Sequence, residues 1–335
     1  MIFRSSAVLA SAIMLCGILQ GQTVRTWTVR PEWVKAHEDF LASDAMGGRG
    51  SATRLEEITA AYVASEFEAY GLKPAPGMDG YIQSADIEPY TDPKGRARLR
   101  LAGKPGDRKT FNAIGYLQGA DPDSGTILLT AHLDHLGTVP SGEDRIYNGA
   151  NDDASGTTAV LELAHALAAG PKPRRSLLFA CYGSEEAGGL GSTYFGEHPP
   201  VPLTKLVANV EFEMIGNQDP KTGKGVLTFT GWERSDLGPA LKAHGALLGP
   251  DPYPEQHFFE RSDNYSLALM GVVAHTAAGW GTVPTYHRPD DDVAHLDLPF
   301  VTAAIQSLVE PIRWLAQSDF VPQWNPGGKP QPRGR

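Results

Sequence analysis

Histidine and acidic residues follow one apolar segment after another in this chain. They occur in HLDH after the run 126–131, in the acidic turn GANDDASG (149–156), in SEE after the run 176–182, at Glu213 after the run 206–212, and in YH downstream of the run 271–277. Imidazole nitrogens and carboxylate oxygens are ligands of zinc and similar divalent ions. Their recurrence at five such places predicts a metal centre.

Two histidines and three carboxylates can hold two metal ions when one carboxylate bridges them, at a metal separation of roughly 3.5–4 Å. A metal lowers the pKa of its bound water to about 7, and a nearby carboxylate that is not a ligand can then accept the proton. The adjacent residues Glu185 and Glu186 offer one carboxylate for each of these roles. The residue types therefore favour metal-assisted hydrolysis.

The elements that must position these residues alternate along the chain. The segments 126–131, 176–182, 206–212 and 271–277 are short and apolar, as buried strands are, whereas 55–71, 156–170 and 298–315 have helical spacing. This alternation predicts an α/β fold with three α/β/α layers and a mixed, mainly parallel central sheet. Ligands of such sheets bind beyond the carboxyl ends of the strands, so the histidines and carboxylates should gather at one edge.

Five motifs in this order resemble those of the co-catalytic dizinc exopeptidases, the family of bacterial leucyl aminopeptidases and glutamate carboxypeptidase (metallopeptidase family twenty-eight). The motifs are AHLDH (131–135), GANDDASG (149–156), SEEAGGLGS (184–192), EMIG (213–216) and YHRPDDD (286–292), and upstream LASDAMGGRG (41–50) and YLQGADP (116–122) are also similar. The resemblance extends over most of residues 35–315. It implies a zinc-exopeptidase fold, two zinc ions per chain and a peptide substrate.

The resemblance also implies a role for each matching residue. His132 would bind one metal, and Asp134 would orient His132 through its second ring nitrogen, as carboxylates behind metal ligands do. Asp152 would bridge the two metals, with a cis peptide bond between Asp152 and Asp153.

The remaining roles fall on Glu185, Glu186 and His287. Glu186 and His287 would complete the shell of the second metal. A metal-bridging hydroxide would attack the scissile carbonyl, while Glu185 acts as the general base and passes the proton to the leaving amine.

The sequence departs from the family pattern at two positions. Glu213 stands where the family usually has Asp, and Glu211 would point to the same side of a strand. We expect Glu213 to be the ligand because Met-Ile-Gly follows it directly. Asn264 stands where a His is common and receives no role. His135 neighbours the site and is expected to be structural or to support the ligands rather than to bind metal.

The resemblance favours an aminopeptidase that removes N-terminal residues from peptides. A carboxypeptidase stays open, because no residue in the sequence identifies a binding site for the free amine. Three alternatives stay open: a single-zinc transferase like glutaminyl cyclase, a non-catalytic binding module on the same fold, and an amidase or deacylase of non-peptide amides. Oligomeric state, side-chain preference and native metal are not determined by the sequence.

Composition and termini set the remaining expectations. Hydrophobic residues make up 41% of the 335 residues, enough for a core, and the net charge of −10 argues against nucleic acid as a partner. Residues 1–21 have the positive start and short apolar run of a secretory signal peptide, which implies a secreted or periplasmic protein with no membrane partner after its removal. Residues 22–318 are expected to form a single domain, followed by a disordered tail at 319–335.

Overall fold

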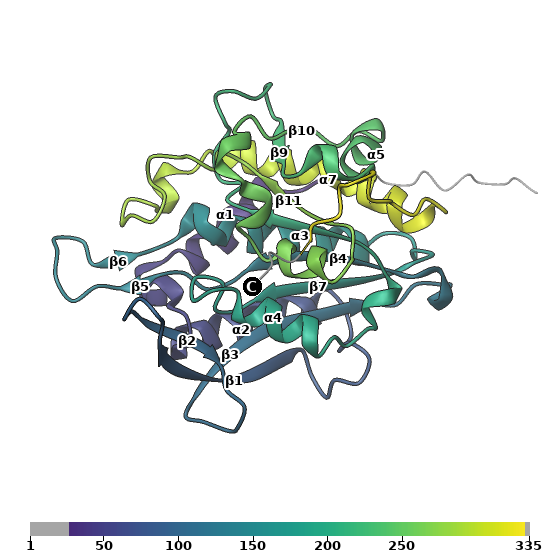
Figure 1. Cartoon of the computed structure of the whole chain (residues 1–335). Coiled ribbons are helices and arrows are strands. Elements are labelled where there is room, and N and C mark those ends of the chain that lie inside the picture. The colour runs from purple at the N-terminus through teal and green to yellow at the C-terminus, as the bar shows by residue number, and fades with distance from the viewer. Residues whose placement is uncertain (1–26, 332–335) are drawn as a thin grey trace, which may run out of the picture.

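The computed structural model describes residues 27–331 and contains one large sheet with helices on both faces (Figure 1). The expected signal peptide at 1–21 lies outside the described residues. Among the helices of residues 27–331, none is both long enough and apolar enough to cross a bilayer.

Nine strands form this sheet, in the order β10-β9-β11-β8-β4-β7-β3-β1-β2. Their bounds are β1 Ile82–Thr91, β2 Ala97–Leu101, β3 Arg108–Leu117, β4 Thr126–His132, β7 Ser176–Tyr182, β8 Leu206–Glu213, β9 Leu227–Phe229, β10 Leu248–Pro250 and β11 Ala274–Ala278. The central strands β7, β4, β8 and β11 are parallel, whereas β3, β1 and β2 on one side are antiparallel and β9 pairs antiparallel with β11. The sheet is mixed as expected, and its parallel part is the part that carries the predicted site.

The helices and the two remaining strands complete the fold. They are α1 Pro31–Leu41, α2 Arg54–Ala69, α3 Ser155–Ala168, α4 Leu190–Glu197, α5 Leu237–Ala243, α6 Asn264–Leu269 and α7 Leu298–Gln317, with a small hairpin of β5 Gly137–Thr138 and β6 Ile146–Tyr147. The hairpin extends from the body of the molecule in Figure 1.

Alternating side chains of the central strands build two cores. On β7, Leu177 and Phe179 pack with α1, α2, α3 and α7 on one face, whereas Leu178 and Ala180 pack with α4 and α6 on the other. Both faces are covered because every residue of β4 and β7 is buried. The three-layer α/β/α architecture expected from the sequence is confirmed.

Strands β1, β2 and β3 are a feature that the sequence analysis missed. Strands β1 and β2 occupy a polar stretch rich in glycine and proline, and β3 begins at the end of it; β2 reads ARLRL with both arginines exposed. Strands near the edge of a sheet need only one apolar face, so they lack the continuous apolar run of the buried strands.

The expectation of a disordered tail from residue 319 is wrong for residues 319–331. Trp324 packs against both cores and pairs with Ser235, and the Gln323 backbone N–H donates to Asp236 at 2.7 Å. An indole held by apolar contacts on both sides orders a segment whose proline and glycine content alone suggested disorder.

Candidate metal centre

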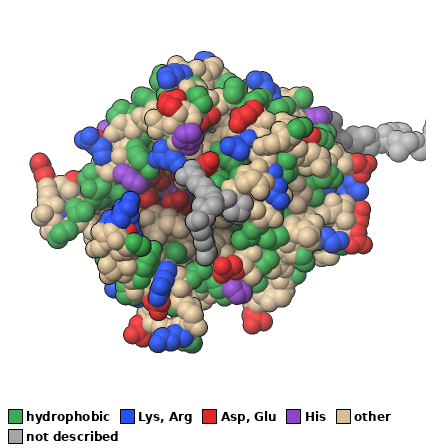
Figure 2. Space-filling view, in the orientation of Figure 1, with side chains coloured by type: hydrophobic (Ala, Val, Ile, Leu, Met, Phe, Trp, Pro, Cys, Tyr) green, Lys and Arg blue, Asp and Glu red, His purple; other side chains and the backbone are tan. Residues whose placement is uncertain are grey.

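The carboxyl ends of the parallel strands bring the predicted residues together. His132 is the last residue of β4, Glu213 is the last residue of β8, and Glu185 follows β7 after a two-residue turn. Asp152 lies in the turn before α3, and its carboxylate reaches the same edge of the sheet. Figure 2 shows acidic side chains in a hollow on this face, with histidine nearby.

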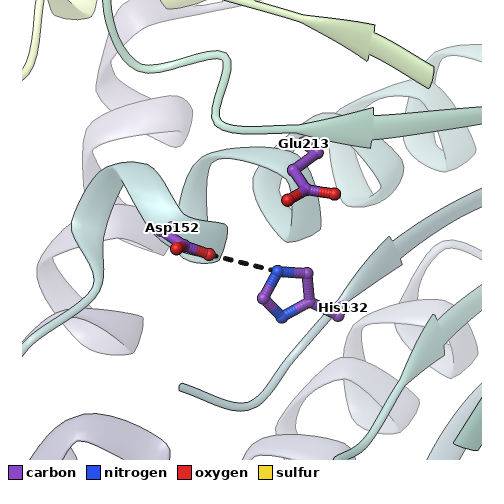
Figure 3. Close-up of side chains that lie close together, drawn as sticks. All are labelled: His132, Asp152 and Glu213. Carbon is purple, nitrogen blue, oxygen red and sulfur yellow. Dashed lines mark ion pairs between the residues drawn. The ribbon is translucent and has the colours of Figure 1, made fainter. Parts of the chain in front are cut away.

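A first set of ligand atoms comes from His132, Asp152 and Glu213 (Figure 3). One atom of each side chain lies within 4.8 Å of the others, and His132 Nε2 is 3.2 Å from Asp152 Oδ1. The three residues come from three segments far apart in the sequence, and a cation between them would be held by one nitrogen and two carboxylates.

A second set shares Asp152 with the first. It contains His135, Asp152 and Glu186 within the same limit. His287 also reaches it, with Nε2 3.2 Å from both Asp152 Oδ2 and Glu186 Oε1, while His135 Nδ1 is 2.9 Å from the same Glu186 oxygen. The structure thus brings together the five expected ligands and adds His135.

The donor atoms have the chemistry of a cation site. In the described part of the chain, the buried atoms His132 Nε2, Asp152 Oδ1 and Glu186 Oε1 have no hydrogen bond, although buried polar atoms normally do. Burial opposes a charge on His287, yet the carboxylates of Asp152 and Glu186 outweigh it and raise its pKa to about 10. A metal ion would replace the proton there, because metal ligation requires neutral imidazole.

The turn that carries Asp152 is fixed by its backbone. The Asp152–Asp153 peptide bond is cis, as the family resemblance implied. Asp291 accepts hydrogen bonds from the N–H groups of Asn151 and Asp152 at 2.9 and 3.0 Å. Asp153 accepts from the N–H groups of His132 and Met214 at 3.2 and 3.0 Å, so it also links the ends of β4 and β8.

Asp134 lies beside His132 and also contacts the turn of Glu185. Its carboxylate is 3.7 Å from His132 Nδ1, and that nitrogen is 3.2 Å from the Asp134 carbonyl oxygen. The carboxylate also accepts from the backbone N–H of Glu185 at 2.9 Å and from the Ser51 hydroxyl at 2.5 Å. Asp134 therefore holds the turn that carries Glu185.

The Glu185 side chain belongs to neither set of ligand atoms within the described residues. Burial raises its pKa well above the ordinary value, and the charges of Asp263 and Glu213 add to this effect, whereas His132 opposes it. Glu185 lines a cavity with Ser192 and Tyr265 beside α4 and α6. A carboxylate with a raised pKa next to a metal site suits proton transfer near neutral pH.

Glu211 and Glu213 lie close together but have different surroundings. Glu211 is fully buried and accepts hydrogen bonds from the Asn264 N–H at 2.5 Å and the Thr276 hydroxyl at 3.1 Å. The Ser262 hydroxyl contacts both carboxylates. Only Glu213 appears in a set of ligand atoms, which supports Glu213 over Glu211 as the ligand.

Comparison with known proteins identifies the family. The family model described as peptidase family M28 matches residues 112–310, more than half of the chain. The chain belongs to peptidase family M28.

The chain is also similar to a curated protein and to solved structures. Leupeptin-inactivating enzyme 1 of Streptomyces exfoliatus is 34% identical over 149 residues, which are 44% of this chain and 32% of that protein. An aminopeptidase from Aneurinibacillus sp. strain AM-1 has a TM-score of 0.63 at 16% identity, covering 86% of this chain and 94% of that one. A glutaminyl cyclase from Bacteroides thetaiotaomicron has a TM-score of 0.60 at 19% identity, covering 86% and 99%.

These fold neighbours show the architecture of the M28 chain but not its reaction, since an aminopeptidase and a glutaminyl cyclase resemble it almost equally. The chain spans 32%, 19% and 51% of the length of three curated relatives, the last of which is an aminopeptidase of Bacillus subtilis. The expectations of the family and of the fold class are confirmed.

Sequence analysis did not expect His135 among the ligand atoms and gave no role to the side chains of Asp153 and Asp291. His135 and Asp153 each stand next to a predicted residue, so proximity in sequence was the available indication. Asp291 lies in the YHRPDDD motif, but its partners are backbone N–H groups about 140 residues away, which no spacing rule reveals.

Proposed function

We propose that this chain is a zinc-dependent aminopeptidase that hydrolyses the N-terminal peptide bond of peptides. His132, Asp152 and Glu213 would hold one zinc ion, and Asp152, Glu186 and His287 the other, with His135 beside them. The observation that carries the proposal is that Asp152 belongs to both sets of ligand atoms. A carboxylate that belongs to both sets can bridge a pair of metal ions.

Zinc at these residues would supply Lewis acidity to the scissile carbonyl and acidify a water molecule. The chain's own part is to place proton acceptors and exclude solvent. Glu185 takes the proton from the attacking water and passes it to the leaving amine, because its carboxylate is buried, is not a ligand and has a raised pKa. Its backbone is held by Asp134, so the carboxylate is presented from a fixed turn.

The cavities beside the site suggest where the substrate lies. One is lined by Glu213, Phe258 and Tyr286, and the other by Glu185 and residues of α4 and α6. Since Glu185 protonates the leaving amine, the second cavity would take the leaving part of the peptide and the first the N-terminal side chain. We also propose that the expected domain at residues 22–318, together with the packed residues 319–331, acts as one secreted or periplasmic domain.

The test combines metal content with substrate preference. We expect two zinc ions per chain and hydrolysis of leucyl amides with a free amine but not of their N-acetylated forms. Glu185→Gln should keep both zinc ions and lower kcat by about 10²–10⁴-fold, the usual contribution of a general base. Glu197→Gln, the same change at an exposed position at the end of α4, is the matched control.

Other results would change the assignment. One zinc ion per chain with cyclisation of Gln-initiated peptides would indicate a glutaminyl cyclase. Equal cleavage of free and N-acetylated substrates would indicate a broader amidase, and wild-type activity in Glu185→Gln would remove Glu185 from its role.

A further inference from the structure

A short segment upstream of the family match reaches into the metal centre. The family model begins at residue 112, whereas Arg49, Ser51 and Glu56 lie before and within the first turn of α2. We call these three residues the upstream clamp. Each of them contacts a different part of the loops that carry the proposed ligands and base.

Arg49 joins the loops of the two metal-ligand segments. It is fully buried, and its guanidinium donates to the carbonyls of Leu133 at 3.0 Å, Asn148 at 2.6 Å and Gly149 at 2.8 Å, as well as to Leu41 at 2.7 Å. Leu133 directly follows the ligand His132, and Gly149 lies three residues before Asp152. The Arg49 side chain therefore fixes the backbone of two loops, the one that follows His132 and the one that precedes Asp152.

The backbone beside Arg49 adds to this connection. The His135 N–H donates to the Arg49 carbonyl at 3.1 Å, and Gly50 forms a bridge with His135. The Ser51 hydroxyl donates to Asp134, whose other oxygen accepts from the Glu185 N–H. The clamp thus reaches the turn of the general base through one intermediate residue.

Glu56 contacts that turn directly. Its Oε2 accepts from the Ser184 hydroxyl at 2.8 Å and the Ala52 N–H at 2.7 Å, while its Oε1 accepts from the Thr110 hydroxyl and the Phe111 N–H, both at 2.9 Å. Ser184 immediately precedes Glu185. Because each carboxylate oxygen of Glu56 faces one backbone N–H, both oxygens must act as hydrogen-bond acceptors.

We propose that the upstream clamp positions the catalytic centre, with Arg49 holding the metal-binding loops and Glu56 holding the turn of Glu185. This inference rests on the proposed function. Arg49 and Glu56 are positioning residues, since neither belongs to a set of possible ligand atoms within the described residues. Lysine cannot replace Arg49, because a single ammonium cannot reproduce the planar fork that faces carbonyls in several directions. Glutamine cannot replace Glu56, because its amide nitrogen would face a backbone N–H at either end.

The division of labour predicts two separable defects. Arg49→Lys should weaken zinc binding by about 10–100-fold, the usual effect of a residue behind the metal ligands, and kcat at saturating zinc should change less. Glu56→Gln should keep zinc affinity within about threefold of wild type and lower kcat by about 10–100-fold with little change in KM, because a small misplacement of a catalytic group costs this much.

The helix start supplies matched controls for both variants. Arg54 is exposed, Glu57 is partly exposed, and the two form an ion pair at 2.6 Å on the surface of α2. Arg54→Lys and Glu57→Gln make the same chemical changes in the same segment, and both should match wild type. Zinc affinity is measured by competition with a chromogenic chelator, kcat and KM on a leucyl arylamide, and folding by thermal melting.

Two outcomes would overturn the inference: wild-type values in both clamp variants, or equal losses of zinc affinity and kcat in each, which indicate a general loss of stability. If either variant fails to fold, Ser51→Ala removes only the contact with Asp134. It should lower kcat by about threefold to tenfold without loss of zinc, and an unchanged kcat would overturn the inference. If wild type hydrolyses no peptide, the proposed function fails, whereas the zinc-affinity comparison still tests Arg49.

Discussion

Glu38 on α1 should make the protein less stable as the pH rises. The side chain is fully buried, and burial raises its pKa from 4.5 to about 8, with Thr158 and Arg49 opposing the shift. A carboxyl with a raised folded-state pKa binds a proton on folding. The contribution of Glu38 to the free energy of unfolding is therefore fully present below pH 4.5 and is lost as the pH rises through 8.

The size of the effect follows from the shift. At roughly 1.4 kcal/mol per pKa unit the whole shift is worth about 5 kcal/mol, of which about 3–4 kcal/mol falls between pH 5 and pH 8. Glu38→Gln keeps the shape of the neutral acid and cannot ionise. The variant should thus match wild type near pH 5 and be more stable than wild type by about 3–4 kcal/mol at pH 8.

Urea unfolding at pH 5, 6.5 and 8, followed by tryptophan fluorescence at one fixed zinc concentration, measures this difference. Comparing variants at each pH cancels the effects of metal binding that they share. Asp39→Asn is the matched control, because Asp39 is the next residue, is half exposed and pairs with Lys35 at 2.6 Å. A difference in the free energy of unfolding between wild type and Glu38→Gln that stays constant with pH would refute the reasoning.

Three further predictions concern the metals, a buried histidine and the tail. Glu186→Ala, like treatment of wild type with a chelator, should reduce bound zinc and lower Tm and activity together, and added zinc should restore only the chelated wild type. Burial lowers the pKa of His275 to about 4, so the neutral imidazole stabilises the fold fully above pH 6.5 and this stabilisation is lost as the pH falls towards 4. The free energy of unfolding of His275→Gln should therefore fall by about 2 kcal/mol less than that of wild type between pH 7.5 and pH 5. Truncation after Ser318 should lower the free energy of unfolding in urea by about 2–3 kcal/mol, because it removes the Trp324 indole from both cores. An unchanged urea midpoint would show that the tail does not stabilise the fold.

The sequence predicted the elements that carry the site better than those that flank it. Strands β4, β7 and β8 match the predicted segments to within a residue, because strands buried on both faces are continuous apolar runs. The antiparallel strands were missed, since residues such as Arg98 and Arg100 alternate with apolar ones at the sheet edge.

The candidate site divides in the same way. Its ligands could be predicted because strand ends and motifs put specific side chains at one edge. The contacts of Arg49 could not, because its partners are backbone carbonyls up to 100 residues away and any residue type provides a carbonyl. Side-chain patterns reveal ligands, whereas the support behind them is visible only in three dimensions.

The strand order leaves two edges, β10 and β2, and both are poorly suited to recruiting a strand from another molecule. At one margin, Pro250 lacks the N–H that a new ladder would need. At the other, Arg98 and Arg100 carry charge along a short strand and pair with Asp92 and Glu88 on the same hairpin. Charged side chains and proline on edge strands are a common protection against aggregation. This open sheet should therefore resist polymerisation through its two edge strands, even at high protein concentration.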